Sequence, residues 1–243
     1  MGTSLKFLSG GDTGLTVQVG SEIDRKTNAA VMRLGSAIDA AKIFGVIETV
    51  PTYLSLLVHY DPLKTSRLEL IRAIEALNES DASASEVEPR SWSFPVCFEG
   101  QDFAPDIDLV AQWAGLAPED VISDIVAAEQ FVYMIGFAPG QPYIGDLPDR
   151  IAIPRRKDPI PGVPAGSVVI ATGKTVIYSV SNPTGWYIVG RTPLPIFDRS
   201  KEEPVLLRAG DKVRLHAVSR FEFESIRERI ALGDYRPESD AQI

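Results

Sequence analysis

The sequence predicts an α+β protein in which a small N-terminal α/β sandwich precedes a β-rich domain of the barrel or sandwich type. Strand and helix segments alternate in the first part of the chain, and a polar segment with almost nothing to bury follows. From Phe131 onward, short apolar runs alternate with Gly and Pro turns. We therefore expect an N-terminal α/β domain over residues 1–80, a linker over residues 81–92 and a β-barrel domain over residues 93–243.

The N-terminal domain is expected to hold two helices, each preceded by strand-forming segments. Short β-type runs within Leu5–Gly20 flank a Gly-Gly-Asp turn. Apolar residues recur at intervals of three and four in Asp24–Phe44, which predicts an amphipathic helix. Val46–Tyr60 is rich in β-branched and aromatic residues but is interrupted by Pro51, and Lys64–Leu77 again has helical spacing. These elements can form one layer of helices on one sheet.

The polar run at residues 78–90 is the best linker candidate, because it offers almost no apolar surface to bury. Beyond it we expect a strand at Phe94–Phe98 and helices near Ile107–Ala114 and Pro118–Ala128. The residues after Pro237 are expected to be frayed. Further strands are expected at Phe131–Ile135, Val168–Ile170, Thr175–Val180, Trp186–Val189 and Lys212–Ala217, with a last helix at Arg220–Ala231.

Composition and charge argue against several classes of protein. The 243 residues are 44% hydrophobic and 23% charged, as in ordinary globular proteins, and the net charge of −9 argues against an extended nucleic-acid surface. No run approaches roughly 18 apolar residues, so no membrane span is expected. The N-terminus lacks a signal-peptide pattern, which favours a cytoplasmic protein. With two histidines and Cys97 as the only cysteine, neither an intrachain disulfide nor a bound metal is expected.

Residues 131–198 contain an unusual density of Gly, Pro and aromatic residues. Such loops can be the turns of an ordinary barrel, or they can hold backbone N–H groups rigidly toward an oxyanion or a phosphate. Residues 171–175 (ATGKT) end like a phosphate-binding P-loop, but Val168 stands where that motif usually has Gly, and strand-type runs lie on both sides. We therefore expect no nucleotide-binding loop in this chain.

An ordered series of short motifs extends along nearly the whole chain. A single Gly-Phe-x-Pro-Gly would be weak, but the order and number of the motifs are specific. The motifs are Gly11-Asp12, Val50-Pro51-Thr52-Tyr53, His59-Tyr60-Asp61-Pro62, Pro95-Val96-Cys97, Gly136-Phe137-Ala138-Pro139-Gly140, Tyr143, Pro154-Arg155, Val163-Pro164-Ala165-Gly166-Ser167, Gly185-Trp186 and Gly190-Arg191-Thr192-Pro193.

This series resembles the family that includes the B-type subunit of 5-oxoprolinase, allophanate hydrolase subunit 1 and KipI-like kinase inhibitors. The resemblance implies a cyclophilin-like β-barrel in the C-terminal part. It also implies a larger homologous partner, of the 5-oxoprolinase C type or the allophanate hydrolase subunit 2 type, and possibly a third protein of the A type. In such an assembly ATP would activate a carbonyl oxygen by phosphorylation, and 5-oxoproline would be opened to glutamate. The implied function is the B-type subunit of an ATP-dependent amidohydrolase of the 5-oxoprolinase or allophanate type, active on a small molecule only with its partner.

The chain departs from the family pattern at four places. Gln141 stands where an aromatic usually follows Pro-Gly, and Thr184 replaces the first Gly of Pro-Gly-Gly-Trp. Pro159 is followed by Ile160 rather than by a second arginine, and Ile125 stands near a position where histidine is common. These departures keep a second interpretation open, in which the protein is a regulatory binding protein that inhibits a sensor histidine kinase. Prolyl isomerase activity is poorly supported, because the chain has no Phe-His-Arg run.

Arg155 and Arg191 are the residues that we expect to recognise an anion. A guanidinium can hold a carboxylate or a carboxyphosphate-like group through two parallel hydrogen bonds, although either arginine can instead bind loop carbonyls. Ser167 is expected to donate a hydroxyl hydrogen bond to substrate. No histidine lies near it in sequence, so an activated serine nucleophile is poorly supported.

Tyr143 and Trp186 are expected to form the walls of a pocket for a flat amide, with Gly140 in the rigid loop beside them, although packing beneath the loops is an equal alternative. His59 is the available general base, since imidazole titrates near neutral pH. It lies at the end of a strand in the other predicted domain. Because the Gly/Pro loops hold few titratable groups, we expect the site to be completed across a subunit interface.

Overall fold

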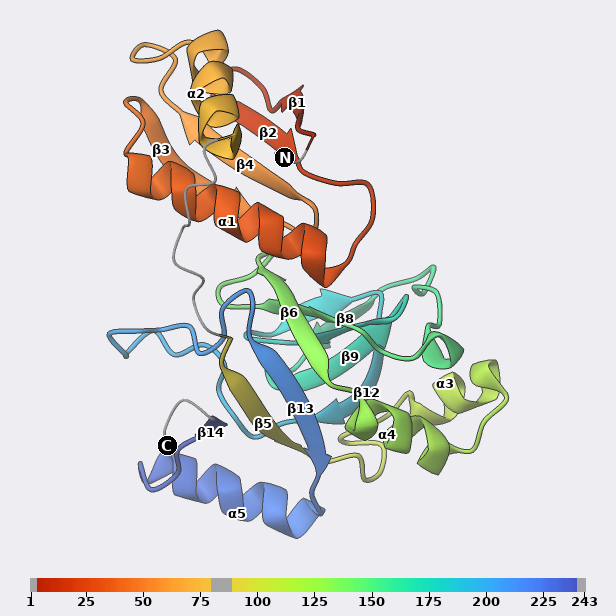
Figure 1. Cartoon of the computed structure of the whole chain (residues 1–243). Coiled ribbons are helices and arrows are strands. Elements are labelled where there is room, and N and C mark those ends of the chain that lie inside the picture. The colour runs from red at the N-terminus through yellow and green to blue at the C-terminus, as the bar shows by residue number, and fades with distance from the viewer. Residues whose placement is uncertain (1–3, 80–88, 240–243) are drawn as a thin grey trace. The chain divides into compact units, whose positions relative to one another are not determined.

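The computed structural model describes residues 4–79 and 89–239. They fall into two compact units, one within Met1–Glu88 and the other within Pro89–Ile243 (Figure 1). Each unit has a sheet and a hydrophobic core of its own. The chain is therefore a mixed α/β protein, as the sequence predicted.

The expected linker over residues 81–92 is only partly described. Residues 81–88 lie outside the described part of the chain. The end of the linker was predicted wrongly, because strand β5 (Ser91–Val96) begins before residue 92. Trp92 is buried in the core of the second unit and pairs with Val213. The alternation of buried and partly buried side chains in β5 therefore begins within the segment that was expected to be linker.

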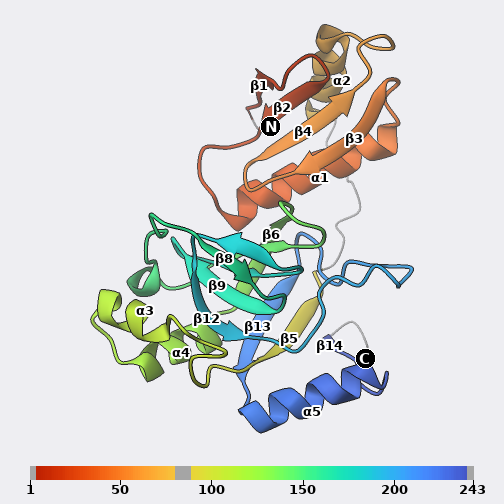
Figure 2. The ribbon, with the colours of Figure 1, turned by 180° about the vertical axis from the view of Figure 1, so that it is seen from behind.

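The first unit is a four-stranded sheet in the order β1-β2-β4-β3, with both helices on one face (Figure 1, Figure 2). Helix α1 begins after Asp24, whose carboxylate accepts a hydrogen bond from Thr27 N at 2.7 Å. Its apolar stripe, including Val31 and Ile38, packs against Leu15, Val17, Leu56 and Val58 in one core cluster. The elements are β1 (Lys6–Ser9), β2 (Gly14–Gln18), α1 (Arg25–Ala41), β3 (Val46–Pro51), β4 (Ser55–Tyr60) and α2 (Arg67–Glu79).

The second unit is built on a mixed eight-stranded sheet in the order β12-β9-β10-β7-β6-β13-β5-β14. Among these described strands, only β13 and β5 run parallel; the other neighbours are antiparallel. Strands β11 and β8 form a separate pair. The strands are β5 (Ser91–Val96), β6 (Gln130–Ile135), β7 (Pro142–Gly145), β8 (Ile160–Val163), β9 (Ser167–Ala171), β10 (Lys174–Ile177), β11 (Asn182–Thr184), β12 (Tyr187–Arg191), β13 (Lys212–Ala217) and β14 (Glu238–Ser239).

The large sheet is not the closed barrel that was expected. Its strand order begins at β12 and ends at β14, so within the described residues no continuous ladder returns to the first strand. An isolated bridge joins Cys97, just after β5, to Arg191 at the end of β12. The two backbone hydrogen bonds of this bridge measure 2.9 and 3.0 Å. The sheet therefore curls enough to bring the end of β12, at one edge, next to the residue that follows β5.

Helices flank the second sheet at two places. Helices α3 (Ile107–Ala114) and α4 (Pro118–Ala127) pack on each other, and the short 3₁₀ helix η1 (Asp149–Ile151) contacts α3. Helix α5 (Arg220–Ala231) lies beside the ends of β5 and β13 (Figure 1). Phe223 attaches it to the sheet, since this ring packs edge-on against Phe103 at 4.9 Å and shares a cluster with Cys97.

The chain after Pro237 was expected to be frayed, and for its described part this was wrong. Strand β14 pairs with β5 through Glu238 and Ser239, opposite Ser93 and Trp92. The pairing gives the otherwise exposed edge of β5 a partner, which satisfies its outward backbone groups.

Candidate functional site

A pocket of about 250 Å³ lies in the second unit, between the loop that leads into β9, the segment that follows β12, and helix α5. Its walls combine backbone-rich loop residues, two arginines and several apolar side chains. The lining residues are Ala165, Gly166, Tyr178, Ser179, Arg191, Thr192, Pro193, Leu194, Pro195, Ile196, Phe197, Phe223 and Arg227.

The local backbone explains how Arg191 reaches this pocket. It is the last residue of β12 and pairs with Ser167 of β9, while the bridge to Cys97 holds its other side. The next residue, Thr192, donates its backbone N–H to Gly166 O at 2.9 Å. Gly166 has φ +81°, and a Cβ there would lie 2.5 Å from Thr192 O, so only glycine allows this approach. The Pro-Ala-Gly-Ser motif thus closes tightly against the Arg191 loop.

The pocket is electropositive in an acidic protein. Arg191 and Arg227 line it, and no Asp or Glu is among the described residues of its lining. Arg227 pairs with Glu224 on its own helix at 2.5 Å, and both of these side chains are substantially exposed. Arg191 has no carboxylate partner among the described residues, and its buried Nε has no hydrogen-bond partner there either. A small anion would find complementary charge in this pocket.

The structure places two predicted site residues beside the pocket rather than in its lining. Ser167 is 2% exposed and lies on β9 directly opposite Arg191. Gly140 is also buried and has φ +67°; a Cβ at this position would lie 3.2 Å from Cβ of Phe197, a lining residue. Both residues therefore contact or adjoin the residues that form the pocket walls.

A second cluster brings together three of the predicted residues. Tyr143 and Trp186 pack with Tyr178 on one face of the sheet. Arg155 is exposed, and its charge acts on the phenols of both tyrosines. Burial raises the pKa of each phenol above its usual value, and the arginine offsets part of that rise. Tyr178 belongs to this aromatic cluster and also lines the pocket, so the two candidate regions adjoin.

The neighbouring arginine, Arg156, has the loop-stapling role that was considered for Arg155. It forms an ion pair with Asp106 and lies over the ring of Tyr187 at 4.3 Å. Asp106 also accepts a hydrogen bond from Ile188 N at 2.8 Å. Arg155 has no ion pair or hydrogen bond with the described residues, so its guanidinium is available to a ligand.

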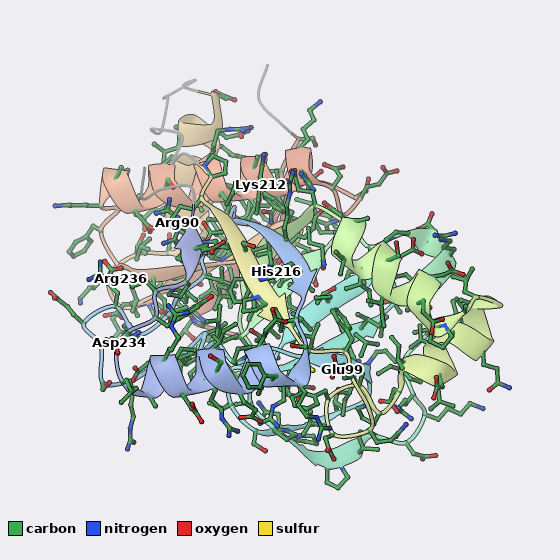
Figure 3. All side chains as sticks on the ribbon, turned by 90° about the horizontal axis from the view of Figure 1, so that it is seen from below. Arg90, Glu99, Lys212, His216, Asp234 and Arg236 are labelled. Atoms are coloured by element: carbon green, nitrogen blue, oxygen red, sulfur yellow. The ribbon has the colours of Figure 1, made fainter. Side chains whose placement is uncertain are left out.

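The histidines and the cysteine lie outside both regions. His59 is in strand β4 of the first unit, where it pairs with Gly14 and Glu48. His216 lies on β13, and its Nδ1 is 2.9 Å from Ser93 Oγ on the parallel neighbour β5 (Figure 3). Burial raises the pKa of the Cys97 thiol, which disfavours the reactive thiolate.

The structure agrees with the rejection of residues 171–175 as a P-loop. They form a tight hairpin between antiparallel β9 and β10, with Thr172 and Gly173 at positive φ, and a strand follows where a P-loop needs a helix. Within residues 4–79 and 89–239, no group of three or more His, Cys, Asp or Glu side chains is arranged to hold a metal ion. No helix in this described part of the chain is both long and apolar enough to cross a membrane.

Ser179, Tyr178 and Arg227 were not singled out from the sequence. The first two follow β10, away from the Gly/Pro motifs, and Arg227 is on the last helix. A signal existed for Arg227, because it lies four residues after Phe223, and residues at that spacing share a helix face. Only the three-dimensional arrangement shows that this face meets the Arg191 loop.

Comparison with known proteins gives a consistent set of matches. The family model described as carboxyltransferase domain, subdomain C and D, matches residues 5–207. The B-type subunit of 5-oxoprolinase from Bacillus subtilis (strain 168) is 37% identical over 228 residues, which cover 90% of this chain and 95% of that protein. The crystal structure of TTHA0988 is 30% identical, with a TM-score of 0.74 over 85% of this chain, which spans 40% of that protein. The K. lactis urea amidolyase structure is 21% identical and supports the fold alone, with a TM-score of 0.78 over 97% of this chain and 16% of that protein.

Proposed function

The chain belongs to the family of carboxyltransferase domains, subdomains C and D, and we propose that it is the B-type subunit of an ATP-dependent amidohydrolase of the 5-oxoprolinase type. The observation that carries this proposal is its similarity, along nearly the whole length of both chains, to a 5-oxoprolinase subunit of the B type. The proposed reaction is the hydrolytic opening of a small cyclic amide. The curled sheet of the second unit would correspond to the cyclophilin-like barrel of the family.

In this proposal the chain binds and orients the substrate. Arg191 offers a charged hydrogen bond to an anionic group, and the adjoining aromatic cluster of Tyr143, Tyr178 and Trp186 offers flat apolar surface to an amide. Arg155 is exposed beside this cluster and can hold a second anionic group.

ATP is proposed to bind elsewhere in the assembly. Residues 171–175 form a strand hairpin and do not fit a nucleotide, so no step is assigned to ATP on this chain. The chemistry that ATP would supply is phosphoryl activation of a carbonyl oxygen.

The catalytic site is proposed to be completed by a larger homologous subunit of the C type, with a third, A-type protein as a further component. The described pocket lining contains arginines, hydroxyl groups and apolar side chains, but no His, Asp, Glu, Cys or Lys. General acid–base catalysis needs a group that titrates near the working pH, and neither arginine does so. The partner would therefore bring the acid and the base.

Reconstitution tests the proposal. The chain is co-expressed with the larger subunit and the third component, and ATP-dependent release of glutamate from 5-oxoproline is measured. We expect a stable complex with turnover, and we expect Arg155→Ala to lower kcat/KM by about tenfold to a hundredfold, the effect of losing one charged hydrogen bond. Arg214→Ala is the matched control, because this exposed arginine of β13 pairs with Glu129 away from the pocket.

Two results would contradict the proposal. A complete assembly that forms but does not hydrolyse 5-oxoproline excludes this substrate. Failure of the chain to bind the larger subunit removes the assembly itself and favours the regulatory alternative.

A further inference from the structure

We infer that helix α5 turns the pocket into a binding site for the free carboxylate of a small organic acid, with Arg227 and Ser179 acting beside Arg191. This inference deepens the proposed function and rests on it for the identity of the acid, since 5-oxoproline carries such a carboxylate. It also assigns roles to two residues, on α5 and after β10, that the sequence motifs do not include.

Unsatisfied polar atoms at the pocket point to a ligand. Ser179 lines the pocket and is 8% exposed, yet its buried hydroxyl has no hydrogen-bond partner among the described residues. The same is true of the buried Nε of Arg191. Native proteins rarely leave buried polar atoms unpaired, because each one costs about 1–3 kcal/mol. Both atoms have almost no surface accessible to solvent, so each side chain would turn slightly toward the pocket to donate a hydrogen bond to a bound carboxylate.

The charge of the pocket lining favours an anionic ligand. Two guanidinium groups from different elements, Arg191 at the end of β12 and Arg227 on α5, line a pocket whose described lining has no acidic residue. The ion pair of Arg227 with Glu224 is exposed, and pairs of this kind contribute little in water. Arg227 can therefore turn to a ligand at small cost.

Size and apolar lining select a carboxylate over a phosphate. About 250 Å³ is below the range of drug-sized pockets and suits a ligand of roughly ten non-hydrogen atoms. Leu194, Ile196 and Phe223 form apolar wall, which can cover the hydrocarbon part of an organic acid. A phosphate ion has no apolar part to bury against this wall.

Helix α5 lies outside the part of the chain that matches the family model, which ends at residue 207. The family motifs therefore supply Arg191 and its rigid loop, whereas α5 supplies Phe223 and Arg227. Helix α5 therefore adds to the pocket lining one guanidinium group and one aromatic ring that lie outside the family motifs.

Direct binding to the purified full chain tests the inference without any turnover. The 5-oxoproline anion, its neutral primary amide and inorganic phosphate are titrated separately by calorimetry. We expect 5-oxoproline to bind at least about tenfold more tightly than the amide or phosphate, and both Arg227→Gln and Ser179→Ala to weaken it by about tenfold. Arg229→Gln is the matched control, because this arginine is on the same helix but lies over Tyr235 outside the pocket.

The outcomes separate the inference from the proposed function. Equal binding of acid and amide, tighter binding of phosphate, no binding to the wild-type chain, or an unaffected Arg227→Gln variant of native melting temperature would each overturn the carboxylate site. Hydrolysis by the full assembly with an unchanged KM in Arg227→Gln would do the same while leaving the proposed function standing. Carboxylate binding that follows the expected pattern, without hydrolysis in the assembly, would overturn the function and leave the site.

Discussion

At the scale of single residues, the phenol pKa values of Tyr143 and Tyr178 can be used to test the candidate site in the absence of substrate. Burial raises the pKa of both phenols, since ionisation would place a negative charge in an apolar cluster, and the nearby Arg155 charge opposes that rise. We expect Arg155→Gln to raise the pKa of both phenols further. Ultraviolet difference titration measures this, with Tyr143→Phe and Tyr178→Phe to assign the two signals.

The control for that titration is Arg214→Gln, which removes an arginine from an exposed strand position and leaves the aromatic cluster intact. Unchanged phenol pKa values in Arg155→Gln would show that the guanidinium is not held beside the rings.

The direction of these pKa shifts also determines how the free energy of unfolding changes with pH. A phenol whose pKa is raised by folding contributes stability that is present below the unfolded value, about 10, and is lost as pH rises through the folded value. Tyr143→Phe should therefore reduce the loss of stability at alkaline pH.

At the scale of elements, α5 can be tested separately, because the pocket depends on it. The helix starts with a capping box, in which Ser219 Oγ accepts from Glu222 N at 3.2 Å and Glu222 accepts from Ser219 N at 2.8 Å. We expect Ser219→Ala to lower the free energy of unfolding by about 1 kcal/mol. Urea denaturation measures it, and faster amide exchange in the first turn of α5 would locate the change.

The matched control for the cap is Ser225→Ala, a substitution within the same helix. Alanine has the higher helix propensity there, so stability should be unchanged or slightly increased. Equal losses in both variants would mean that the hydroxyl of Ser219 does not stabilise the start of α5.

The elements also show which parts of the fold and site could be predicted from the sequence. Helices with a clear apolar period were located well, and the predicted bounds of α3 and α5 coincide with the observed ones. Strands β8 and β11 were missed because Ile160–Val163 and Asn182–Thr184 contain Pro or Gly, which are depleted in strands. Arg191 was found through its motif. Ser179 was missed because Phe223 and Arg227, which line the pocket with it, are far away in sequence. No local pattern marks a hydroxyl group that becomes buried without a hydrogen-bond partner only after folding.

At the scale of the whole molecule, the candidate site lies within one of the two units. Pocket, aromatic cluster and α5 all belong to the second unit, whereas His59 belongs to the first. The expectation that His59 is the general base stays a prediction. The proposed binding chemistry does not depend on it, because the pocket forms from residues of one unit.

Separate cores predict separate unfolding, and the chain carries suitable probes for each unit. All three tryptophans, Trp92, Trp113 and Trp186, are in the second unit, so fluorescence follows that unit alone. The two longest described helices, α1 with 17 residues and α2 with 13, are in the first unit and contribute strongly to the far-ultraviolet circular dichroism. The first unit has the smaller core, and smaller cores give lower stability. As the urea concentration is raised, we therefore expect part of the circular dichroism signal to be lost in a first transition. The tryptophan fluorescence should be unchanged at those urea concentrations.

Two core substitutions test directly whether the two units unfold independently. Ile38 of α1 and Ile144 of β7 are almost completely buried in the cores of the first and second unit. Replacing either with alanine removes buried methyl and methylene groups and costs about 2–5 kcal/mol. Ile38→Ala should lower the midpoint of the first dichroism phase and leave the fluorescence midpoint in place, whereas Ile144→Ala should lower the fluorescence midpoint. If both variants moved both probes together, the two units would unfold as one cooperative structure, and the division into domains at the polar segment would be wrong.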